Sequence, residues 1–303
     1  MILVTGGTGF IGAAVVEELL ARGEQVAVVG RDAARIRRRF GERVTARAVD
    51  VRDPSPEGLP AAFAGAEVVI DAVQFPTSPM EIPRRGWTFE EVDYKGTVNQ
   101  VEAAKAAGVR RFVYLSGAGA APAAAPHWFR FKWQAEQHLA ASGLEWAVVR
   151  PTWVYGPNDN SLNRLLRFGR FLPFLPMFGN GKQAMQPVFV EDVARVVAEA
   201  ALRPEAANQL FELGGPEVMT MDEVLKTALA VMGKRRFILH QPVFVGKALG
   251  RVAALLPTPP LTADAVEFIV LPAVADNANL ERVLRPKLTP LREGLETYLR
   301  PSP

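Results

Sequence analysis

Short apolar runs alternate with longer amphipathic stretches through the first half of the chain. The apolar runs predict strands at residues 2–5, 25–30, 44–49, 67–73, 111–116 and 145–150. Between them, helical periodicity covers residues 11–22, 90–107 and 129–142, and a glycine ends each of these stretches. Residues 68–70 are apolar without alternation, which is typical of a strand covered on both faces. The pattern therefore predicts an α/β fold with a doubly wound parallel sheet.

The pattern changes after Pro151, where prolines and glycines mark an irregular segment. Residues 188–190 and 191–202 predict one more strand and helix that return to the first domain. The chain beyond residue 204 is mostly helical in pattern, with short strands expected at 210–213 and 237–240. We therefore predict a first domain at residues 1–155, to which 187–203 return, and a smaller part made of 156–186 and 204–303.

Composition and charge narrow the class of protein. The 303 residues are 49% hydrophobic and 22% charged, which is typical of a globular protein, and a net charge of +3 is too small to predict a nucleic-acid partner. The basic run at residues 35–39 is more simply a solvated helix face than an anion or membrane patch. The absence of cysteine excludes disulfides and thiolate sites, and the three histidines lack ligand spacing, so we expect no metal site. Without a secretory pattern or a long apolar stretch, we expect a soluble cytoplasmic protein.

A glycine-rich segment follows the first predicted strand and opens the first predicted helix: Thr5-Gly6-Gly7-Thr8-Gly9-Phe10-Ile11-Gly12. Gly6 or Gly7 permits a tight turn, and Gly9 lets the backbone approach a pyrophosphate. Gly12 allows close packing of the helix, whose N-terminus presents free N–H groups to the phosphates. In this strand–turn–helix context the motif predicts a Rossmann-type domain that binds a nicotinamide dinucleotide.

Residues at the ends of the second, third and fourth predicted strands indicate which nicotinamide dinucleotide the domain binds. After the second strand, Arg31 suits the 2′-phosphate of NADP(H), whereas Asp32 would serve the ribose hydroxyl of NAD(H) or cap the next helix. We favour NADP(H), with NAD(H) as the alternative. Asp50 and Val51 are expected beside the adenine. The end of the fourth strand is expected beside the cofactor's ribose, at Ala72, Val73 and Gln74.

These segments together resemble the extended and atypical short-chain dehydrogenases/reductases, the NAD-dependent epimerase/dehydratase-like superfamily. The resemblance rests on residues 5–12, Asp50-Val51, and the stretches VRRFVYLS (109–116), RPTWVYGP (150–157) and QPVFVEDV (186–193). The stretches PTPPLTADAV (257–266) and PLREGLETYLR (290–300) are similar to the dehydrogenase-like accessory subunit of respiratory complex I and its bacterial relatives. The resemblance adds Pro151, in the Arg-Pro motif, to the expected cofactor-binding residues.

The resemblance also implies a catalytic set of Ser, Tyr and Lys, and this chain departs from it. Ser116 stands at the Ser position and Lys132 at the Lys position, and both are expected to contact the cofactor. The residue four before Lys132 is Trp128, an indole with no titratable oxygen, so ordinary carbonyl reduction by this route is in doubt.

Three interpretations follow from this departure. The first is an NADP(H)-binding protein with a structural, regulatory or assembly role, as the resemblance to a respiratory accessory subunit implies. The second is an active oxidoreductase or epimerase/dehydratase with a relocated proton donor; the candidate donors are Tyr114, His127 and Tyr155. In the third, the alignment is off by a helical turn and another group faces the nicotinamide.

The smaller part is expected to face a substrate or a protein partner. An apolar ligand, quinone- or lipid-like, would suit four side chains, although packing between the domains explains them more simply: Trp153, Met177, Phe178 and Met185. Residues 243–255 are amphipathic, with Lys247 and Arg251 on the polar side. We favour a helix packed on the core over a membrane-surface helix or a lid, so a peripheral membrane contact is not favoured.

Overall fold

A seven-stranded parallel sheet forms the centre of the computed structural model, which describes residues 1–253, 256 and 261–300. The strand order is β11-β6-β5-β4-β1-β2-β3. The strands are β1 (Ile2–Thr5), β2 (Val26–Gly30), β3 (Thr45–Ala48), β4 (Val68–Asp71), β5 (Arg111–Leu115), β6 (Glu145–Pro151) and β11 (Gln209–Leu213). The predicted Rossmann-type parallel sheet is therefore confirmed, and β11 extends it at one edge.

Helices cover both faces of this sheet, which explains why its central strands β1, β2 and β4 are mostly apolar. The flanking helices are α1 (Phe10–Ala21), α2 (Ala33–Phe40), α3 (Leu59–Phe63), α4 (Lys95–Ala106), α5 (His127–Ala140) and α7 (Val190–Leu202). On one face Val4 belongs to the core that α1 and α7 close; on the other face Leu3 belongs to the core that α3, α4 and α5 close. Successive residues of β1 thus enter opposite cores, as the pleat of a strand requires.

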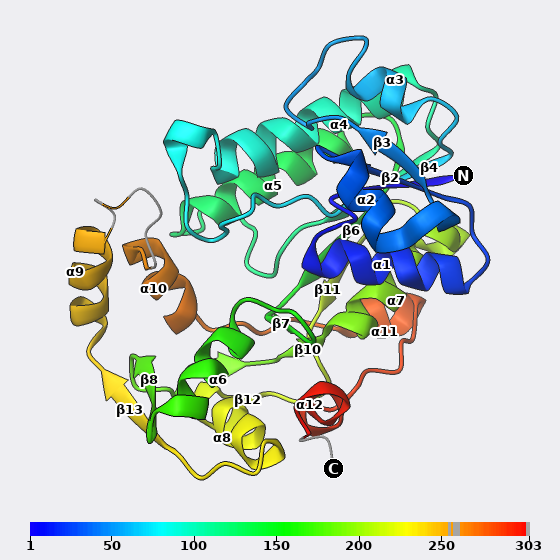
Figure 1. The fold of residues 1–303 in the computed structure, drawn as a ribbon. Helices are drawn as coiled ribbons and strands as arrows, with labels where there is room; N and C mark the ends of the chain where they lie inside the picture. Colours follow the sequence, from blue (N-terminus) through cyan, green and yellow to red (C-terminus); the bar gives the residue numbers. More distant parts are fainter. Residues whose placement is uncertain (254–255, 257–260, 301–303) are drawn as a thin grey trace.

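The second part of the chain is mostly helical, as predicted. Its helices are α6 (Leu162–Phe171), α8 (Met221–Val231), α9 (Val243–Ala253), α10 (Ala263–Val270), α11 (Ala278–Val283) and α12 (Leu291–Leu299). Three small sheets join them: β7 (Val154–Tyr155) with β10 (Val188–Phe189), β9 (Ala184–Met185) with β12 (Met219–Thr220), and β8 (Phe174–Phe178) with β13 (Phe237–Gln241). Figure 1 shows this part below and beside the sheet, with α9 and α10 at its outer edge.

Three details differ from the sequence predictions. The strand expected at 210–213 was assigned to the smaller part, but as β11 it pairs with β6 in the large sheet. The strand expected at 188–190 pairs with β7 instead, and only the following helix α7 packs on α1. The large apolar side chains of α9 do not pack on the core: Phe244, Leu249 and Val252 are exposed, and the buried residues of the helix are Gly246 and Gly250. Residues 254–255, and residues 257–260 of the PTPPLTADAV stretch, lie outside the described residues.

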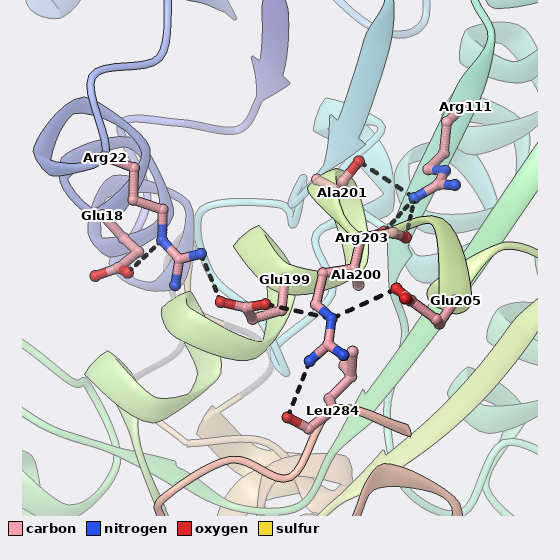
Figure 2. Close-up of polar contacts among 9 residues, drawn as sticks. All are labelled: Glu18, Arg22, Arg111, Glu199, Ala200, Ala201, Arg203, Glu205 and Leu284. Atoms are coloured by element: carbon pink, nitrogen blue, oxygen red, sulfur yellow. Dashed lines mark hydrogen bonds and ion pairs between the residues drawn. The ribbon is translucent and has the colours of Figure 1, made fainter. Parts of the chain in front are cut away.

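Buried Arg111 fixes α7 to the sheet (Figure 2). Its guanidinium donates to the carbonyl oxygens of Ala200 (3.3 Å), Ala201 (3.4 Å) and Arg203 (2.6 Å) at the C-terminal end of α7. A cation there satisfies carbonyls that lack helical partners and meets the negative end of the helix dipole. Arg111 also donates to Glu145 at the start of β6 (3.0 Å), so one side chain joins β5, β6 and α7.

Ion pairs connect the same helix to α1. Arg22 lies 2.6 Å from Glu199 of α7 and 2.7 Å from Glu18 of its own helix (Figure 2). These side chains are partly exposed, so their contribution is a small addition to the apolar packing between the two helices.

In the described parts of the chain, no helix combines the length and the apolar character needed to cross a membrane. The same residues contain no cluster of three or more acidic or histidine side chains placed to hold a metal ion.

Candidate functional site

The glycine loop joins β1 to α1 and is held against the end of β4. Gly6 has a positive φ of 68°, and a Cβ added there would lie 2.4 Å from the carbonyl oxygen of Ala72. A Cβ on Gly12 would lie 2.3 Å from the carbonyl oxygen of Gly6, so α1 packs directly on the loop. Side chains are thus excluded at both positions by backbone, and of Gly6 and Gly7 it is Gly6 that makes the left-handed turn.

Gly9 differs from its neighbours because it faces outward. It is exposed, and an added Cβ would meet one atom only, the carbonyl oxygen of Gly6 at 3.1 Å. Gly9 is also the N-cap of α1, which has no side-chain cap and no acidic residue in its first turn. The N–H groups and the positive end of the helix dipole are therefore open to an anion at this point.

The other predicted cofactor residues gather around this loop. Because the strands are parallel, their carboxyl ends lie at one edge of the sheet, where ligands of such folds bind. The structure brings to this edge the residues that follow β2, β3, β4 and β5 and the last residue of β6: Arg31, Asp50, Val51, Ala72, Val73, Gln74, Ser116 and Pro151.

Charged groups beyond β2 and β3 have distinct partners. Asp32 caps α2 by accepting from the backbone N–H of Arg35 (3.0 Å), a bond that lowers the pKa of its carboxyl group. Burial acts to raise the pKa of Asp50, but Arg52 at 2.7 Å and the charge of Arg31 lower it overall. Arg31 itself is exposed. The edge beside the glycine loop is therefore basic, with Asp32 engaged in the helix cap.

A further arginine reaches the loop from the run that sequence analysis treated as a solvated helix face. Arg39 of α2 donates from Nη1 to the carbonyl oxygen of Thr8 at 3.3 Å. Its position in the basic run at 35–39 does not distinguish it from its neighbours, so this contact could not be predicted from the sequence.

Lys132 is buried and forms an ion pair with buried Asp93. Lys132 Nζ lies 3.1 Å from Asp93 Oδ1 and 5.6 Å from the centre of the Tyr114 ring. Burial raises the pKa of Asp93 to about 6 although the ammonium of Lys132 acts to lower it. Burial acts to lower the pKa of Lys132, but the surrounding acidic groups, Tyr114, Asp93 and Asp71, raise it overall. The ammonium is thus fixed in place, charged, below the end of β5.

Asp93 belongs to a buried polar stripe that sequence analysis missed. Asp93 lies near the end of a π-helical segment (Phe89–Tyr94) that leads into α4, and Thr97 and Gln100 follow it on the buried side of α4. Thr97 donates to Asp71 (2.7 Å), and Thr5 donates to Gln100 (2.6 Å). Polar residues at spacings of four and three within a helical pattern were the signal available in the sequence. The stripe connects the glycine loop to Lys132 beneath the site.

Ser116 and Trp128 have buried polar atoms that no described group satisfies. Ser116 Oγ and Trp128 Nε1 both lack a hydrogen-bond partner among the described residues. Trp128 lies one turn before Lys132 on the buried face of α5 and packs against Phe89 and, from α10, Phe268. Unpaired buried donors are costly, and they are commonly explained by a ligand or water that the site receives.

His127 is the one predicted proton-donor candidate that has a suitable partner at this site. Its Nε2 donates to Glu81 Oε2 at 3.0 Å, and both side chains are partly exposed, at 32% and 20%. The imidazole ring lies edge-on to Trp128, with the ring centres 5.4 Å apart. Sequence analysis did not identify Glu81, because it is far from His127 in the chain and lies in an irregular segment.

The two tyrosine candidates are placed unfavourably for proton transfer. Tyr114 is buried within β5, its hydroxyl has no partner among the described residues, and burial raises its pKa. Tyr155 packs in the core of the smaller part, where its hydroxyl donates to the carbonyl oxygen of Leu291 (3.4 Å). Trp153, Met177 and Met185 lie in that same core, and Phe178 packs on Gly246.

Comparison with known protein families and sequences agrees with the geometry of the glycine loop. A family model described as NAD(P)H-binding matches residues 6–204. A mitochondrial NADH dehydrogenase (ubiquinone) 1 alpha subcomplex subunit 9 from Arabidopsis thaliana is 30% identical over 254 residues, covering 81% of this chain and 61% of that protein. The NAD(P)H azoreductase of Xenophilus azovorans is 31% identical over 234 residues, covering 77% and 74%. The chloroplastic divinyl chlorophyllide a 8-vinyl-reductase of Zea mays is 28% identical over 313 residues, covering 94% and 69%. The chain thus spans less than two thirds of the Arabidopsis relative.

Solved structures with the same fold include an epimerase and an NADPH-dependent oxidoreductase. The UDP-glucose 4-epimerase of Thermotoga maritima, with UDP-glucose, superimposes with a TM-score of 0.75 at 22% identity, covering 98% of this chain and 97% of the other. The NADPH-dependent quinone oxidoreductase of Escherichia coli, with NADPH, has a TM-score of 0.73 at 22% identity, covering 98% and 99%. At this identity the likeness shows a shared fold.

Proposed function

Because this chain belongs to the NAD(P)H-binding family of atypical short-chain dehydrogenases/reductases, we propose that it binds NADP(H) across the glycine loop. The open N-terminus of α1 at Gly9 supports this proposal, since it offers backbone N–H groups to a pyrophosphate. Ser116 and Lys132 would hold the nicotinamide end, where the partnerless Ser116 hydroxyl and the fixed ammonium are available. The bound dinucleotide supplies hydride chemistry.

The preference for NADP(H) rests on the different roles of Arg31 and Asp32. One carboxylate oxygen of Asp32 accepts the hydrogen bond that caps α2, whereas Arg31 is exposed just after β2. A guanidinium forms paired charge-assisted hydrogen bonds with a phosphate, which a ribose hydroxyl does not match. Arg39, whose guanidinium contacts the loop at Thr8, adds a second cation on this side.

The role that the geometry favours is structural, regulatory or assembly-related rather than carbonyl reduction. Trp128 fills the place of a proton donor with an indole, and Tyr114 is buried with a raised pKa. Neither delivers a proton at neutral pH. The similarity to a subunit of mitochondrial NADH dehydrogenase supports a dinucleotide that stabilises a protein within redox metabolism.

A second candidate function is reduction of an apolar substrate by NADPH, and the His127–Glu81 pair favours it. Histidine is the side chain most often used for proton transfer in enzymes, and this one is held by a carboxylate beside the aromatic cluster of Phe75, Phe89 and Trp128. Two of the relatives are named as reductases, of azo compounds and of a vinyl group. In this function His127 would protonate the substrate atom next to the one that receives the hydride.

Arg31→Asp tests the cofactor preference. Loss of the paired bonds to a phosphate is expected to weaken NADPH binding by about tenfold or more, with a much smaller effect on NADH. Arg37→Asp is the matched control, because Arg37 is an exposed arginine of α2 that lines a hollow at the opposite edge of the sheet, with Met1 and Gln25. Equal loss of both nucleotides with Arg31→Asp would refute the role of Arg31.

Activity separates the two candidate functions. The purified chain with NADPH is offered a panel of quinones, azo dyes and conjugated alkenes, and nucleotide oxidation is followed. The structural role predicts no turnover. Turnover that falls in His127→Ala and in Glu81→Gln, with NADPH affinity unchanged, would establish the reductase instead.

A further inference from the structure

One end of the smaller part exposes an unusual amount of apolar surface. Among the described residues, most of the large apolar side chains left in solvent come from α6, β13 and α9. Phe171 at the end of α6 is 87% exposed, Phe244 of α9 is 73% exposed and Val252 of α9 is 68% exposed. Contiguous exposed apolar surface on a globular protein marks an interaction site.

Helix α9 packs with its glycines toward the protein interior and its large apolar side chains toward solvent. Gly246 and Gly250 face the interior, where an added Cβ would lie 2.7 Å from the ring of Phe178 and 2.5 Å from the backbone of Thr262. Phe244 and Val252 lie two turns apart on the outer side, together with exposed Leu249. An isolated globular protein would bury the large side, so this orientation indicates that the outer side meets an apolar partner.

The elements that carry this surface lie next to one another. β13 pairs with β8 from Phe237–Phe174 to Gln241–Phe178, and Arg236 donates to the carbonyl oxygen of Gly169 in α6 (3.1 Å). Figure 1 shows α9, β13, β8 and α6 following one another along the lower left edge of the molecule. We call this surface, formed by the described parts of residues 162–178 and 234–256, the basic apolar face.

The charge of this face has a single sign. Residues 162–178 and 234–256 contain eight Lys or Arg and no Asp or Glu, although the whole chain carries only three net positive charges. Lys234, Arg235 and Arg251 are exposed beside the apolar side chains. Acidic groups occur at the margin, where Glu267 pairs with Lys247 (2.9 Å) and Asp222 pairs with His240 (2.9 Å).

From this combination we propose that the basic apolar face docks on the surface of an anionic lipid bilayer. Phe244, Leu249 and Val252 enter the boundary between headgroups and acyl chains, and the lysines and arginines lie at the level of the phosphates. A second copy of the chain is a poorer partner, because a symmetric contact sets the same positive charges against each other. A polyanion without apolar groups leaves the aromatic and aliphatic side chains in water. This inference concerns a surface apart from the dinucleotide site and does not depend on it.

Flotation with vesicles tests the proposal. The protein is expected to float with vesicles of phosphatidylcholine and phosphatidylglycerol, to bind far less to phosphatidylcholine alone, and to be released by high sodium chloride. Each cation near an anionic surface contributes about fivefold to partitioning, so Arg235→Gln with Arg251→Gln is expected to weaken binding by about thirtyfold. Phe244→Ser with Val252→Ser is expected to abolish binding that resists salt.

Matched variants keep the test specific. Arg37→Gln with Arg84→Gln removes the same charge from exposed positions outside the face, and Val218→Ser with Val274→Ser removes exposed apolar groups elsewhere. All four variants change exposed side chains, and thermal melting verifies that they fold. Equal effects of face and control variants, or no binding to anionic vesicles, would overturn the proposal. So would a dimer seen by light scattering that Phe244→Ser with Val252→Ser dissolves, because that result assigns the face to a second copy.

Discussion

Two glycine substitutions distinguish the contribution of the glycine loop to stability from its proposed contribution to NADPH binding. In Gly9→Ala the new methyl group meets only the carbonyl oxygen of Gly6, at 3.1 Å, so a shift of a few tenths of an ångström accommodates it. Gly9 is the N-cap of α1, and an alanine there costs roughly 1 kcal/mol of stability. In Gly12→Ala the methyl group would lie 2.3 Å from the same oxygen, about 1 Å inside ordinary contact, so α1 must move away from the loop.

The consequences for binding and for stability therefore differ. The methyl group in Gly9→Ala stands where a pyrophosphate approaches the backbone, and loss of one or more charge-assisted bonds weakens NADPH binding by about 2 kcal/mol, roughly thirtyfold. Gly12→Ala loses binding as well, and it also loses about 1–2 kcal/mol of unfolding free energy, because overpacking outweighs the better helix propensity of alanine.

Two measurements on each variant give the comparison. NADPH affinity is measured by quenching of tryptophan fluorescence, and stability is measured by urea unfolding without nucleotide. We expect Gly9→Ala to combine a large loss of affinity with a small loss of stability. Wild-type affinity in Gly9→Ala would show that no phosphate approaches the backbone there, and wild-type stability in Gly12→Ala would refute its packing role.

Substitutions of Lys132 and Trp128 at the site, and of Arg111 beneath α7, give further tests. Lys132→Ala is expected to weaken NADPH binding by about tenfold or more, and an unchanged dissociation constant would show that α5 does not contact the nucleotide. Arg111→Met leaves three carbonyl groups of α7 without their cation and is expected to cost about 2–3 kcal/mol of unfolding free energy in urea. Arg110→Met breaks a half-exposed ion pair with Glu145, the glutamate that Arg111 also contacts, and is expected to cost less than about 1 kcal/mol of unfolding free energy. Equal losses of stability in the two variants would refute the capping role of Arg111. Trp128→Tyr restores a hydroxyl at the proton-donor position, so this variant is expected to oxidise NADPH with carbonyl compounds that the wild-type protein does not reduce. Carbonyl reduction by the wild-type protein would contradict the proposed non-catalytic role.

Most of the fold could be predicted because local pattern and tertiary structure agree in the first 150 residues. Buried strands with apolar residues on both faces, and helices that end at glycine, leave few alternatives to a doubly wound sheet. The prediction was incomplete at β11, because five residues of strand pattern in a helical segment do not indicate which sheet they join. For α9 the sequence predicted a packed helix but not its orientation: Gly246 and Gly250 face inward, because an amphipathic pattern does not specify which side of a helix faces the core.

At the candidate site, residues that belong to a sequence motif could be identified from the sequence. Residues that contact the site from distant segments of the chain could not. Gly6, Gly9 and Lys132 stand out by their spacing. Asp93 and Glu81 approach their partners from segments about forty residues away, and no local rule predicts such pairs. The cytoplasmic location stays a prediction, because relatives of the chain are named as mitochondrial and chloroplastic proteins.

Side-by-side titration of the purified protein with NADPH and NADH is the most direct test of whether the chain binds NADP(H) in preference to NAD(H). Trp128 adjoins the proposed nicotinamide site, so quenching of tryptophan fluorescence reports occupancy. We expect saturable binding of both nucleotides, with NADPH bound at least about tenfold more tightly through Arg31. Equal affinities, or tighter binding of NADH, would contradict the assignment of Arg31, and binding of neither nucleotide would contradict the proposed function altogether.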